Sequence, residues 1–391
     1  MDDVSFVHVS GKSRDGKMTR VLMCGPIAKA GGVSVHTINL TKSLLRYGSD
    51  VIPYSFLGNP EKELVPSEVN ALKKTYYRTL GLMAESIKRR SEYDIIHIQT
   101  SGGISSFISS ISGIVAARML NKYSVITFHY GAGASWSSFY KRYHKVIGFA
   151  VRNCDTFVTV SERNRQLLLK YVADDCSSKI KVVPNGYDEI LFKPLSKKDS
   201  KKQLQIPQES LVIVCIGNLL PHKGQKDLIE AVSALKQGSK RDNLVCYIIG
   251  DGPTYGELEG LIKEHSLEDS VILTGRVKVN DLPLYINSSE ILIFPSFQDG
   301  ESFGIVQIEA MGCGKPVVAT RNGGSEEIIV CEDYGLLAEP SDSQDLAEKI
   351  GFALDKKWDE NKILDYVRQY QWGNIAEHIQ LIYAATSQKK S

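Results

Sequence analysis

The composition of this 391-residue chain is that of an ordinary globular protein, with 42% hydrophobic and 24% charged residues. The formal net charge is only +2, so nothing in the global charge requires a nucleic-acid partner. Because one domain usually takes roughly 100–200 residues, the length predicts two domains with a cleft between them.

The cysteines and the hydrophobic runs indicate the compartment. The seven cysteines are Cys24, Cys154, Cys176, Cys215, Cys246, Cys313 and Cys331. They occur singly, without a CxxC pair or a Cys/His cluster of zinc-ligand spacing, so buried reduced thiols are expected. Residues 1–17 do not form a secretory signal, and no apolar run approaches the roughly 20 residues of a transmembrane helix. The sequence therefore predicts a cytoplasmic protein, peripheral to a membrane at most, whose first 17 residues are extended or disordered.

Short apolar runs alternate with longer amphipathic segments in the first half of the chain, as in parallel sheets whose strands are joined by crossover helices. The expected strands are Val21–Cys24, Val51–Tyr54, Ile95–Ile98, Val125–Phe128, Phe157–Val160 and Ile180–Val183. A helix is expected from Val33 to about Leu45. These elements predict one doubly wound α/β domain over residues 18–190.

The alternation restarts after the turn signal Pro184-Asn185-Gly186 and predicts a second doubly wound α/β domain over residues 191–369. A Lys/Ser-rich stretch from Lys193 to Lys202 is interpreted as a linker. The strands expected in this domain are Leu211–Ile216, Val245–Ile249, Val271–Leu273, Ile291–Phe294 and Val317–Ala319. The amphipathic segment Asn374–Tyr383 predicts a C-terminal helix, residues 370–391, that packs back on the first domain. Ligands of such sheets bind beyond the carboxyl ends of the strands, so motifs at those ends are candidates for function.

The first motif is a glycine-containing turn, Gly25 to Gly32, between the first strand and its helix. Backbone amides of such a turn can approach an anion, and the helix dipole adds to the attraction. The spacing is not GxGxxG, and the second strand ends in Pro53-Tyr54-Ser55 without the acid that binds a dinucleotide ribose. This pattern disfavours an NAD(P)-dependent oxidoreductase. A tight turn without a ligand explains the glycines equally well.

The second motif, Gly217 to Gly224, follows the first strand of the second domain and contains Lys223. A lysine at a glycine-flanked turn between a strand and a helix is well placed to neutralise a diphosphate. A solvated surface lysine fits these residues equally well.

The third motif contains two glutamates, Glu301 and Glu309, after the strand that ends at Phe294. If the helix begins at Ser302, Glu301 lies at its N-terminus and Glu309 about two turns along, roughly 12 Å away, where the two could contact different parts of an extended ligand. Both could instead be ordinary helix acids. Glu309, however, lies in the apolar run Ile305–Met311, where an unpaired carboxylate is costly to bury and ribose hydroxyls would supply donors.

Together these motifs resemble glycosyltransferase family 4, from about Met18 to the end of the chain. The matching segments are, in order, Gly31-Gly32, Phe128-His129-Tyr130-Gly131, Val183 to Asp188, Gly217 to Gly224, Phe294-Pro295-Ser296, Glu301 to Glu309, Gly314 to Thr320, Gly323-Gly324 and Glu326. The resemblance implies a retaining enzyme of the GT-B fold, in which two Rossmann-like domains with parallel sheets face each other across a cleft.

The resemblance also implies roles for individual residues. The residues expected to bind the donor are Gly31, Gly32, Asn218, Lys223, Arg276, Val277, Ser302, Phe303, Gly304, Ile305 and Glu309, and those expected to act in catalysis are Glu301, His129 and Lys223. Lys223 would bind the diphosphate, Glu309 the ribose hydroxyls and Glu301 the donor hexose. His129 would face the donor sugar from the first domain, unless it is only a packed histidine at a strand end.

One position departs from the family pattern, because Asn218 stands where the family commonly has an arginine. An asparagine donates hydrogen bonds but carries no charge, so one of the two cations expected at the diphosphate is missing. Either Lys223 suffices, or Arg276, Lys29 or Arg321 supplies the second positive charge.

The reaction implied by the resemblance is transfer of a hexose-type sugar from a nucleotide-diphosphate sugar, with UDP favoured, to an acceptor hydroxyl of a sugar or lipid-linked glycan in surface polysaccharide or glycolipid biosynthesis. No DxD pair is present, so neither a metal nor a cofactor is expected. Hydrogen-bond donors at the departing diphosphate would then supply most of the catalysis, with attack by the acceptor on the same face of the sugar. The alternatives are a GT-B phosphorylase or synthase acting on a soluble sugar, a GT-B epimerase, and a non-catalytic nucleotide-sugar-binding protein.

Two stretches of the first domain mix basic and aromatic residues. They are Lys73 to Arg78, leading to Ile87 to Arg90, and Trp136 to Lys145. Basic amphipathic helices can rest reversibly on an anionic membrane surface, here the inner face of the membrane. A solvated helix face is an equally good explanation of both stretches.

Overall fold

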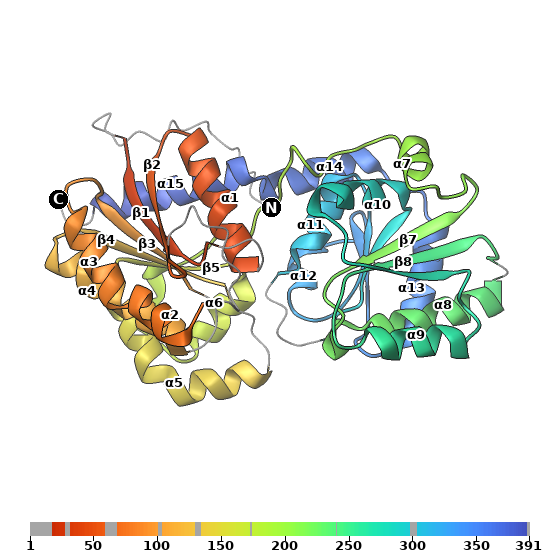
Figure 1. Cartoon of the computed structure of the whole chain (residues 1–391), viewed down its shortest axis with the longest axis horizontal. Coiled ribbons are helices and arrows are strands. Elements are labelled where there is room, and N and C mark those ends of the chain that lie inside the picture. The colour runs from red at the N-terminus through yellow and green to blue at the C-terminus, as the bar shows by residue number, and fades with distance from the viewer. Residues whose placement is uncertain are drawn as a thin grey trace. The chain divides into compact units, whose positions relative to one another are not determined.

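The computed structural model describes residues 18–27, 32–58, 69–100, 104–129, 134–172, 174–239, 241–297 and 303–388. These residues form two compact units, which Figure 1 draws with their elements labelled. The first unit takes its described residues from the chain up to His129, from Trp136–Asn185 and from the C-terminal segment that begins at Trp372. The main segment of the second unit is Gly186–Gln371.

The first unit is built on a six-stranded parallel sheet in the order β2-β1-β3-β4-β5-β6. Its strands are β1 (Arg20–Gly25), β2 (Asp50–Ser55), β3 (Ile95–Thr100), β4 (Tyr123–Phe128), β5 (Thr156–Thr159) and β6 (Ile180–Val182). All six residues of β3 are buried, because helices cover both faces of a parallel sheet.

The helices of the first unit begin where side chains satisfy their free amides. Asn70 Oδ1 accepts from Leu72 N at 2.9 Å before α2, and Ser161 Oγ accepts from Asn164 N at 3.2 Å before α6. The helices are α1 (Gly32–Arg46), α2 (Ala71–Arg78), α3 (Leu80–Lys88), α4 (Ile104–Met119), α5 (Ala134–Asn153), α6 (Glu162–Leu169), the 3₁₀ helix η2 (Asp174–Lys179) and α15 (Trp372–Gln388).

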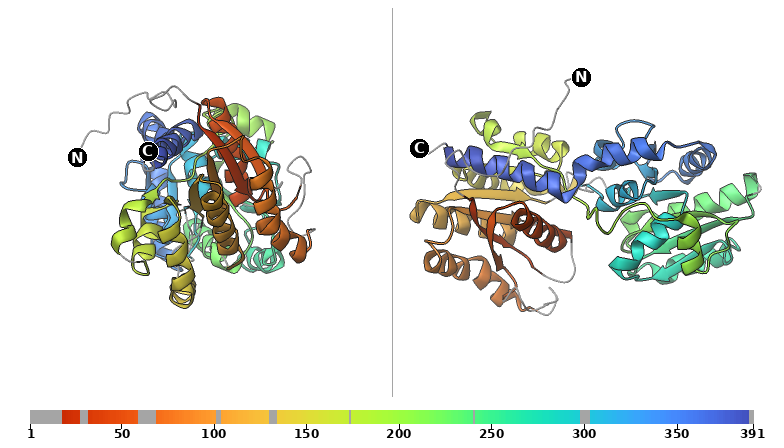
Figure 2. Two further views of the ribbon diagram at one scale, coloured as in Figure 1. Left: turned by 90° about the vertical axis from the view of Figure 1, so that its left-hand side faces the viewer. Right: turned by 90° about the horizontal axis from the view of Figure 1, so that it is seen from above.

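Helix α15 comes from the end of the chain and lies against the sheet of the first unit (Figure 2). Its residues Ile375, Ile379 and Tyr383 are buried in one cluster with residues of β1 and α1. Polar contacts fix its N-terminal turn, since Ser43 Oγ donates to Trp372 O at 2.9 Å. The core of the first unit is therefore completed by the last helix of the chain.

The second unit contains another six-stranded parallel sheet, in the order β12-β11-β10-β7-β8-β9. Its strands are β7 (Leu211–Ile216), β8 (Leu244–Ile249), β9 (Val271–Gly275), β10 (Ile291–Phe294), β11 (Val317–Thr320) and β12 (Gly335–Ala338). The predicted α/β fold of two doubly wound parallel sheets is confirmed. Strand β12 was not expected, because its four residues Gly-Leu-Leu-Ala lack the β-branched and aromatic side chains that mark strands.

Helices cover both faces of this second sheet, and a separate buried cluster lies on each face. The helices are α7 (Lys197–Gln203), α8 (Gln225–Ser239), α9 (Tyr255–Glu264), α10 (Leu282–Ser288), α11 (Ile305–Gly312), α12 (Ser325–Ile328), α13 (Ser343–Asp355) and α14 (Glu360–Val367), with the 3₁₀ helices η3 (Pro221–Lys223), η4 (Val279–Asp281) and η5 (Arg368–Tyr370).

The interpretation of Lys193 to Lys202 as a linker is wrong in its second half, which forms α7. Ser196 Oγ caps this helix by accepting from Asp199 N at 3.2 Å. The side chain of Lys201 is buried, and its Nζ donates to the carbonyl oxygens of Gln208 and Ser210. Backbone acceptors compensate the buried ammonium, so a lysine-rich composition did not prevent folding.

The helix expected to begin at Ser302 begins at Ile305 instead. Gly304 has φ +77°, a left-handed conformation that cannot continue into an α-helix. Glu309 therefore lies about one turn into α11 and not two. Glu301 and Ser302 lie outside the described residues.

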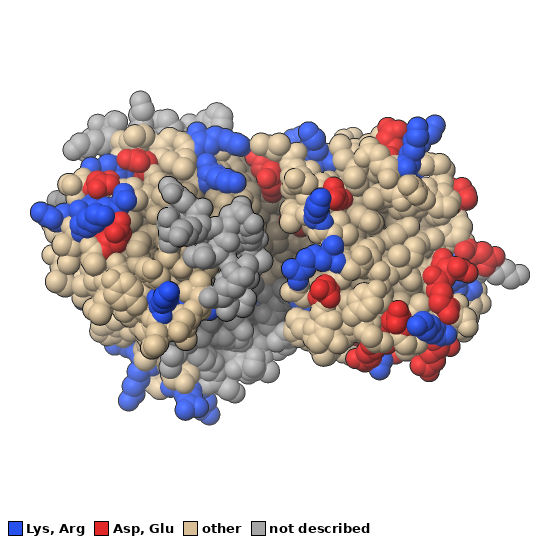
Figure 3. All heavy atoms as spheres, viewed as in Figure 1, with Lys and Arg blue, Asp and Glu red and all other residues tan. Residues whose placement is uncertain are grey.

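Two observations on the described residues bear on the predicted cellular compartment. Six cysteines are buried, whereas Cys331 is exposed. None of the described helices is both long and apolar enough to cross a membrane. Figure 3 shows positive and negative side chains interspersed over the visible face of each unit, in keeping with the low net charge.

The packing of α15 predicts that its buried face stabilises the first unit. Ile379 is 2% exposed and Leu381, on the same helix, is 45% exposed. Ile379→Ala should lower the free energy of unfolding by about 2–5 kcal/mol, as expected for truncating a buried isoleucine. Leu381→Ala should change it by about 0.5 kcal/mol or less, as at an ordinary surface position. Urea unfolding of both variants followed by tryptophan fluorescence measures the difference, and equal losses would contradict the buried position of Ile379.

Candidate donor site

The topology of the second unit places two of its predicted motifs at one edge of the sheet. The strand order reverses between β7 and β10, which are neighbours in the sheet. Crevices beyond the carboxyl ends of strands at such a reversal bind ligands in doubly wound folds. Asn218 and Lys223 follow β7, and Phe303 and Gly304 follow β10. The sequence motifs therefore meet at the switch point of this sheet.

Lys223 ends the short helix η3, and the glycine after it determines its place. Gly224 has φ +70°, and a Cβ at this position would overlap the carbonyl oxygen of Pro295, which directly follows β10. The close approach lets Lys223 Nζ lie 5.7 Å from the centroid of the Phe294 ring. This distance is within the range of a cation–π interaction. The lysine is thus held at the carboxyl end of β10.

Backbone hydrogen bonds join the turns after β7 and β10. His222 O accepts from Phe297 N at 3.1 Å and from Ser296 Oγ at 3.3 Å. Ser296 O accepts in turn from Asn322 Nδ2 at 2.9 Å. Asn322 follows β11, so three consecutive sheet neighbours contribute to one rigid platform around Lys223.

The turn that leads into α11 reaches the same aromatic ring. A Cβ at Gly304 would lie 3.0 Å from Phe294 Cζ, so this turn packs on the ring that Lys223 faces. Phe303 is buried and packs edge-on against Tyr370 at 5.6 Å, and Ile305 is partly buried in the same cluster. Their side chains are therefore core residues, and only their backbone amides, at the N-terminus of α11, remain candidates for binding an anion.

Glu309 has an unusual environment for a carboxylate. Its side chain is partly exposed, yet burial by its surroundings raises its pKa to about 7, and the charge of Asp188 adds to the effect. Asp188 caps its own turn, because its Oδ1 accepts from Ile190 N at 3.0 Å. Within the described part of the chain no donor is recorded for the Glu309 carboxylate. A ligand with hydroxyl donors would satisfy it.

Arg276 and Val277, which were predicted to bind the donor, and the alternative cations are less tightly placed. Arg276 is exposed beyond β9, and Val277 packs partly on the core. The side chain of Asn218 is exposed, and the backbone carbonyl of Asn218 accepts from Gln225 Nε2 at 3.1 Å. Arg321 donates to Glu339 Oε1 at 3.0 Å. Lys29 lies outside the described residues.

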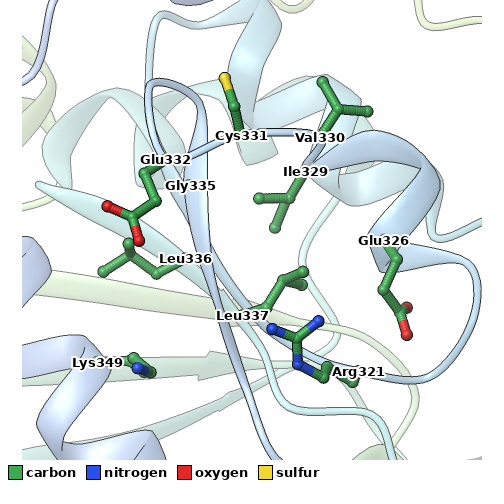
Figure 4. Close-up of a pocket in the computed structure, with 10 residues that line it drawn as sticks. All are labelled: Arg321, Glu326, Ile329, Val330, Cys331, Glu332, Gly335, Leu336, Leu337 and Lys349. Atoms are coloured by element: carbon green, nitrogen blue, oxygen red, sulfur yellow. The ribbon is translucent and has the colours of Figure 1, made fainter.

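Arg321 also lines a cavity of about 590 Å³ at the β12 edge of the second sheet (Figure 4). The side chains of Glu326 and Lys349 border it, together with apolar residues of β12. The Glu326 carboxylate already accepts a hydrogen bond from the backbone, since its Oε2 lies 2.7 Å from Gly323 N. None of the residues predicted to bind the donor lines this cavity.

The predicted residues of the first unit lie at the carboxyl ends of β1 and β4. Gly32 is exposed at the start of α1, and a Cβ there would meet no atom within 4 Å, so packing does not require a glycine. Gly31 lies outside the described residues. His129 follows β4 and is partly exposed, and its Nε2 lies 2.7 Å from Gln99 Oε1.

His129 belongs to a cluster of histidines that the sequence motifs did not reveal. Its ring centroid lies 4.2 Å from that of His36, and Gln99 links it to His97 on β3. Burial lowers the pKa values of His36 and His97 to about 3 and that of His129 well below its ordinary value. All three rings are therefore neutral at physiological pH. The signal in the sequence was the pair of polar residues His97 and Gln99, which alternate with isoleucines in β3.

Comparison with known proteins gives two family models, which between them match most of the chain. The model described as glycosyl transferases group 1 matches residues 196–370, and the model described as glycosyltransferase family 4 matches residues 30–189. A glycosyltransferase of Methanocaldococcus jannaschii, MJ1178, is 28% identical over 377 residues, which cover 91% of this chain and 95% of that protein. The GPI3 subunit of phosphatidylinositol N-acetylglucosaminyltransferase from Saccharomyces cerevisiae is 27% identical and covers 92% of this chain and 81% of its own length.

A solved structure of Anabaena Alr3699/HepE in complex with UDP has the same fold, with a TM-score of 0.71, 22% identity and coverage of 94% of this chain and 100% of that one. The family resemblance seen in the motifs is confirmed. The chain belongs to glycosyltransferase family 4 and is an enzyme that transfers sugar from a nucleotide sugar.

Proposed function

We propose that the enzyme moves a hexose from a UDP-sugar to an acceptor hydroxyl, with retention of configuration and without a divalent metal or cofactor. The observation that carries the proposal is the meeting of two distant motifs on one ring. Lys223 and the turn at Gly304 both contact Phe294, so a fixed cation and the N-terminus of α11 lie together at the switch point of the second sheet. This arrangement suits a diphosphate.

The chemistry follows from where charge develops. As the bond between the sugar and the diphosphate breaks, negative charge grows on the departing phosphate and positive character on the anomeric carbon. Lys223 and the free amides at the start of α11 would stabilise that negative charge without moving, because the platform described above holds them in place. Asn218, exposed beside them, would donate a hydrogen bond in place of the missing arginine.

The remaining roles are assigned to Glu309, His129 and Glu301. Glu309 would accept from the ribose hydroxyls, which are the donors that its carboxylate lacks among the described residues. His129, being neutral, would accept from a hydroxyl of the donor sugar rather than contribute charge. Glu301 remains the residue proposed to hold the hexose, on the strength of the motif alone.

UDP is favoured as the leaving group because the similar structure of HepE contains it. The acceptor is proposed to be a sugar or a lipid-linked glycan, since the yeast relative is a subunit of phosphatidylinositol N-acetylglucosaminyltransferase. Surface polysaccharide or glycolipid assembly is the pathway that fits such an acceptor. A phosphorylase, and a protein that binds nucleotide sugars without turning them over, are the alternatives that the experiments below separate.

Lys223→Ala should lower kcat/KM for the nucleotide sugar about 100-fold or more, the usual cost of removing a preorganised group at a developing oxyanion. The measurement is UDP release from UDP-glucose and UDP-N-acetylglucosamine, with and without inorganic phosphate, over a panel of sugar acceptors. Lys226→Ala, an exposed lysine three residues away, is the matched control and should leave the rate unchanged. Near-normal release by Lys223→Ala would remove the proposed role of this lysine, and release that requires phosphate would favour a phosphorylase.

Glu309 should make nucleotide binding depend on pH. In the folded protein its pKa is about 7, above the ordinary value of 4.5. The raised pKa therefore contributes fully to the stability of the folded state below pH 4.5, and this contribution is lost as the pH rises through 7. Ribose donors favour the ionised form, so UDP should bind about 10-fold more tightly well above pH 7 than well below it.

Calorimetric titration with UDP between pH 5.5 and 8.5 measures this dependence. The phosphate of UDP also ionises near pH 6, and Glu309→Gln corrects for it because the ligand is the same in both titrations. The steeper dependence of the wild type should be absent in Glu309→Gln. Identical pH profiles for the two proteins would contradict a contact between Glu309 and the nucleotide.

We further propose that the enzyme is cytoplasmic and that α2, together with the first residue of α3, brings its first unit reversibly to an anionic membrane surface. Leu72 and Leu80 are 78% and 69% exposed, and the exposed Lys73 lies beside Leu72. Arg78 does not contribute to this face, because it turns over the Phe56 ring at 5.8 Å. The side chains of Trp136 to Tyr140 lie outside the described residues.

The double variant Leu72→Ser, Leu80→Ser should bind vesicles less than the wild type, since each buried CH₂ contributes about 0.8 kcal/mol. Vesicles of phosphatidylcholine with phosphatidylglycerol, sedimented at low salt, measure binding, and high salt should release the protein. Val279→Ser, at an exposed position of the second unit, is the control. Equal recovery of wild-type protein in the supernatant with and without vesicles would reject the proposal.

A further inference from the structure

A chain of buried hydrogen bonds runs from His129 through the first unit to its last helix. His129 Nε2 lies 2.7 Å from Gln99 Oε1, and Gln99 Nε2 lies 3.2 Å from His97 Nε2. His97 also contacts Thr127 Oγ1 at 2.7 Å through Nε2 and the Tyr383 hydroxyl at 2.6 Å through Nδ1. Gln99, His97, Thr127 and Tyr383 are all buried. Water therefore does not compete for these groups.

The surroundings of Gln99 determine which way its amide points. Gln99 Nε2 lies 3.3 Å from Met23 Sδ, and a thioether sulfur can accept a hydrogen bond but has none to donate. A flipped amide would place the carbonyl oxygen against this sulfur without a donor. The amide nitrogen therefore faces Met23 and His97, and the oxygen faces His129. Since that oxygen can only accept, His129 must carry its proton on Nε2.

The tautomer of His97 follows from the same amide. His97 Nε2 accepts from Gln99, so its proton is on Nδ1, from which it donates to the Tyr383 hydroxyl. Thr127 Oγ1 supplies a second donor to His97 Nε2. Burial keeps the rings of His36, His97 and His129 neutral, so each has one donor and one acceptor nitrogen. The only ring nitrogen of His129 left to accept is Nδ1, for which the described residues provide no donor.

We propose that Gln99 is the positioning residue of His129: it holds the imidazole in the Nε2–H tautomer and thereby keeps Nδ1 as an acceptor for a hydroxyl of the donor sugar. The identity of that hydroxyl rests on the proposed function. Gln99 acts only through His129, and the contact with Met23 fixes the orientation of its amide. The consequence is a site that accepts a hydrogen bond at this point and offers neither a proton nor a charge.

Two substitutions at Gln99 separate positioning from packing. Gln99→Met keeps the length and approximate volume of the side chain but removes the acceptor, so His129 should show a mixture of neutral tautomers. Gln99→Glu keeps an acceptor for His129 Nε2–H, so the Nε2–H tautomer should return. If Gln99 only filled space, Gln99→Glu should be the more damaging substitution and Gln99→Met the milder one, because methionine suits a buried site and a carboxylate does not.

The first measurement is ¹⁵N–¹H correlation of the imidazole rings in histidine-labelled protein at pH 8, without donor. The second is kcat and KM with the UDP-sugar that the wild type uses. Gln380→Met is the matched control, because Gln380 is buried in the same unit and its amide donates to Tyr47 O and Ser49 Oγ, away from His129. It should change neither the His129 spectrum nor kcat.

The expected result is a single Nε2–H form of His129 in the wild type and a mixture in Gln99→Met. In that variant kcat should fall about 10-fold to 100-fold with little change in KM, and Gln99→Glu should recover much of the loss. An Nδ1–H tautomer in the wild type, or an unchanged spectrum in Gln99→Met, would overturn the proposal. So would a mixed spectrum with an unchanged kcat.

Failure of the proposed function would look different. If the wild type transfers no sugar from any nucleotide donor, the proposed reaction fails, whereas the ring spectra of the wild type and Gln99→Met still decide the assignment of the tautomer. If Gln99→Glu does not fold, the comparison of Gln99→Met with Gln380→Met decides between positioning and packing.

Discussion

The donor side of this enzyme depends on the absence of one side chain, at Gly224. Only a glycine lets the turn after β7 approach the carbonyl of Pro295 after β10. That contact places Lys223 beside Phe294 and brings the carbonyl of His222 within reach of Phe297 N and Ser296 Oγ. A bulkier residue would push apart the two turns that flank the switch point. The cation would then lose its fixed position before any group that contacts substrate had changed.

The two units differ in the kind of polar group that they supply. The second unit provides formal charge, with Lys223 near Phe294 and a carboxylate on Glu309 that is costly to ionise. The first unit provides neutral groups, because burial keeps the rings of His36, His97 and His129 uncharged. This division suits the proposed donor, which combines a charged diphosphate with an uncharged sugar. Charged groups would bind the diphosphate, and oriented neutral hydrogen-bonding groups would bind the sugar.

The sequence predicted those features that depend on local pattern. Eleven of the twelve strands were expected, since each is an apolar run between turns, and β12 was missed because Gly-Leu-Leu-Ala has no such signature. The start of α11 was misplaced because the backbone conformation of Gly304, and not a capping side chain, ends the preceding turn. Lys223 and Glu309 could be named from motifs. The contact of Gln99 with His129 could not, because it joins neighbouring strands through side chains that look like packing residues until the sheet is assembled.

The place of α15 has a consequence for the order in which the protein can fold during synthesis. The core of the first unit needs Ile379 and Tyr383, which leave the ribosome only after the whole second unit has been made. At about 5–20 residues per second, the roughly 200 residues that separate β6 from α15 delay completion of that core by about 10–40 s. During this interval the nascent first unit exposes the apolar surface that α15 later covers, and His97 lacks its tyrosine partner. The main segment of the second unit, Gly186–Gln371, is made before α15, so the second unit can complete its core before the first unit, although synthesis begins with the first unit.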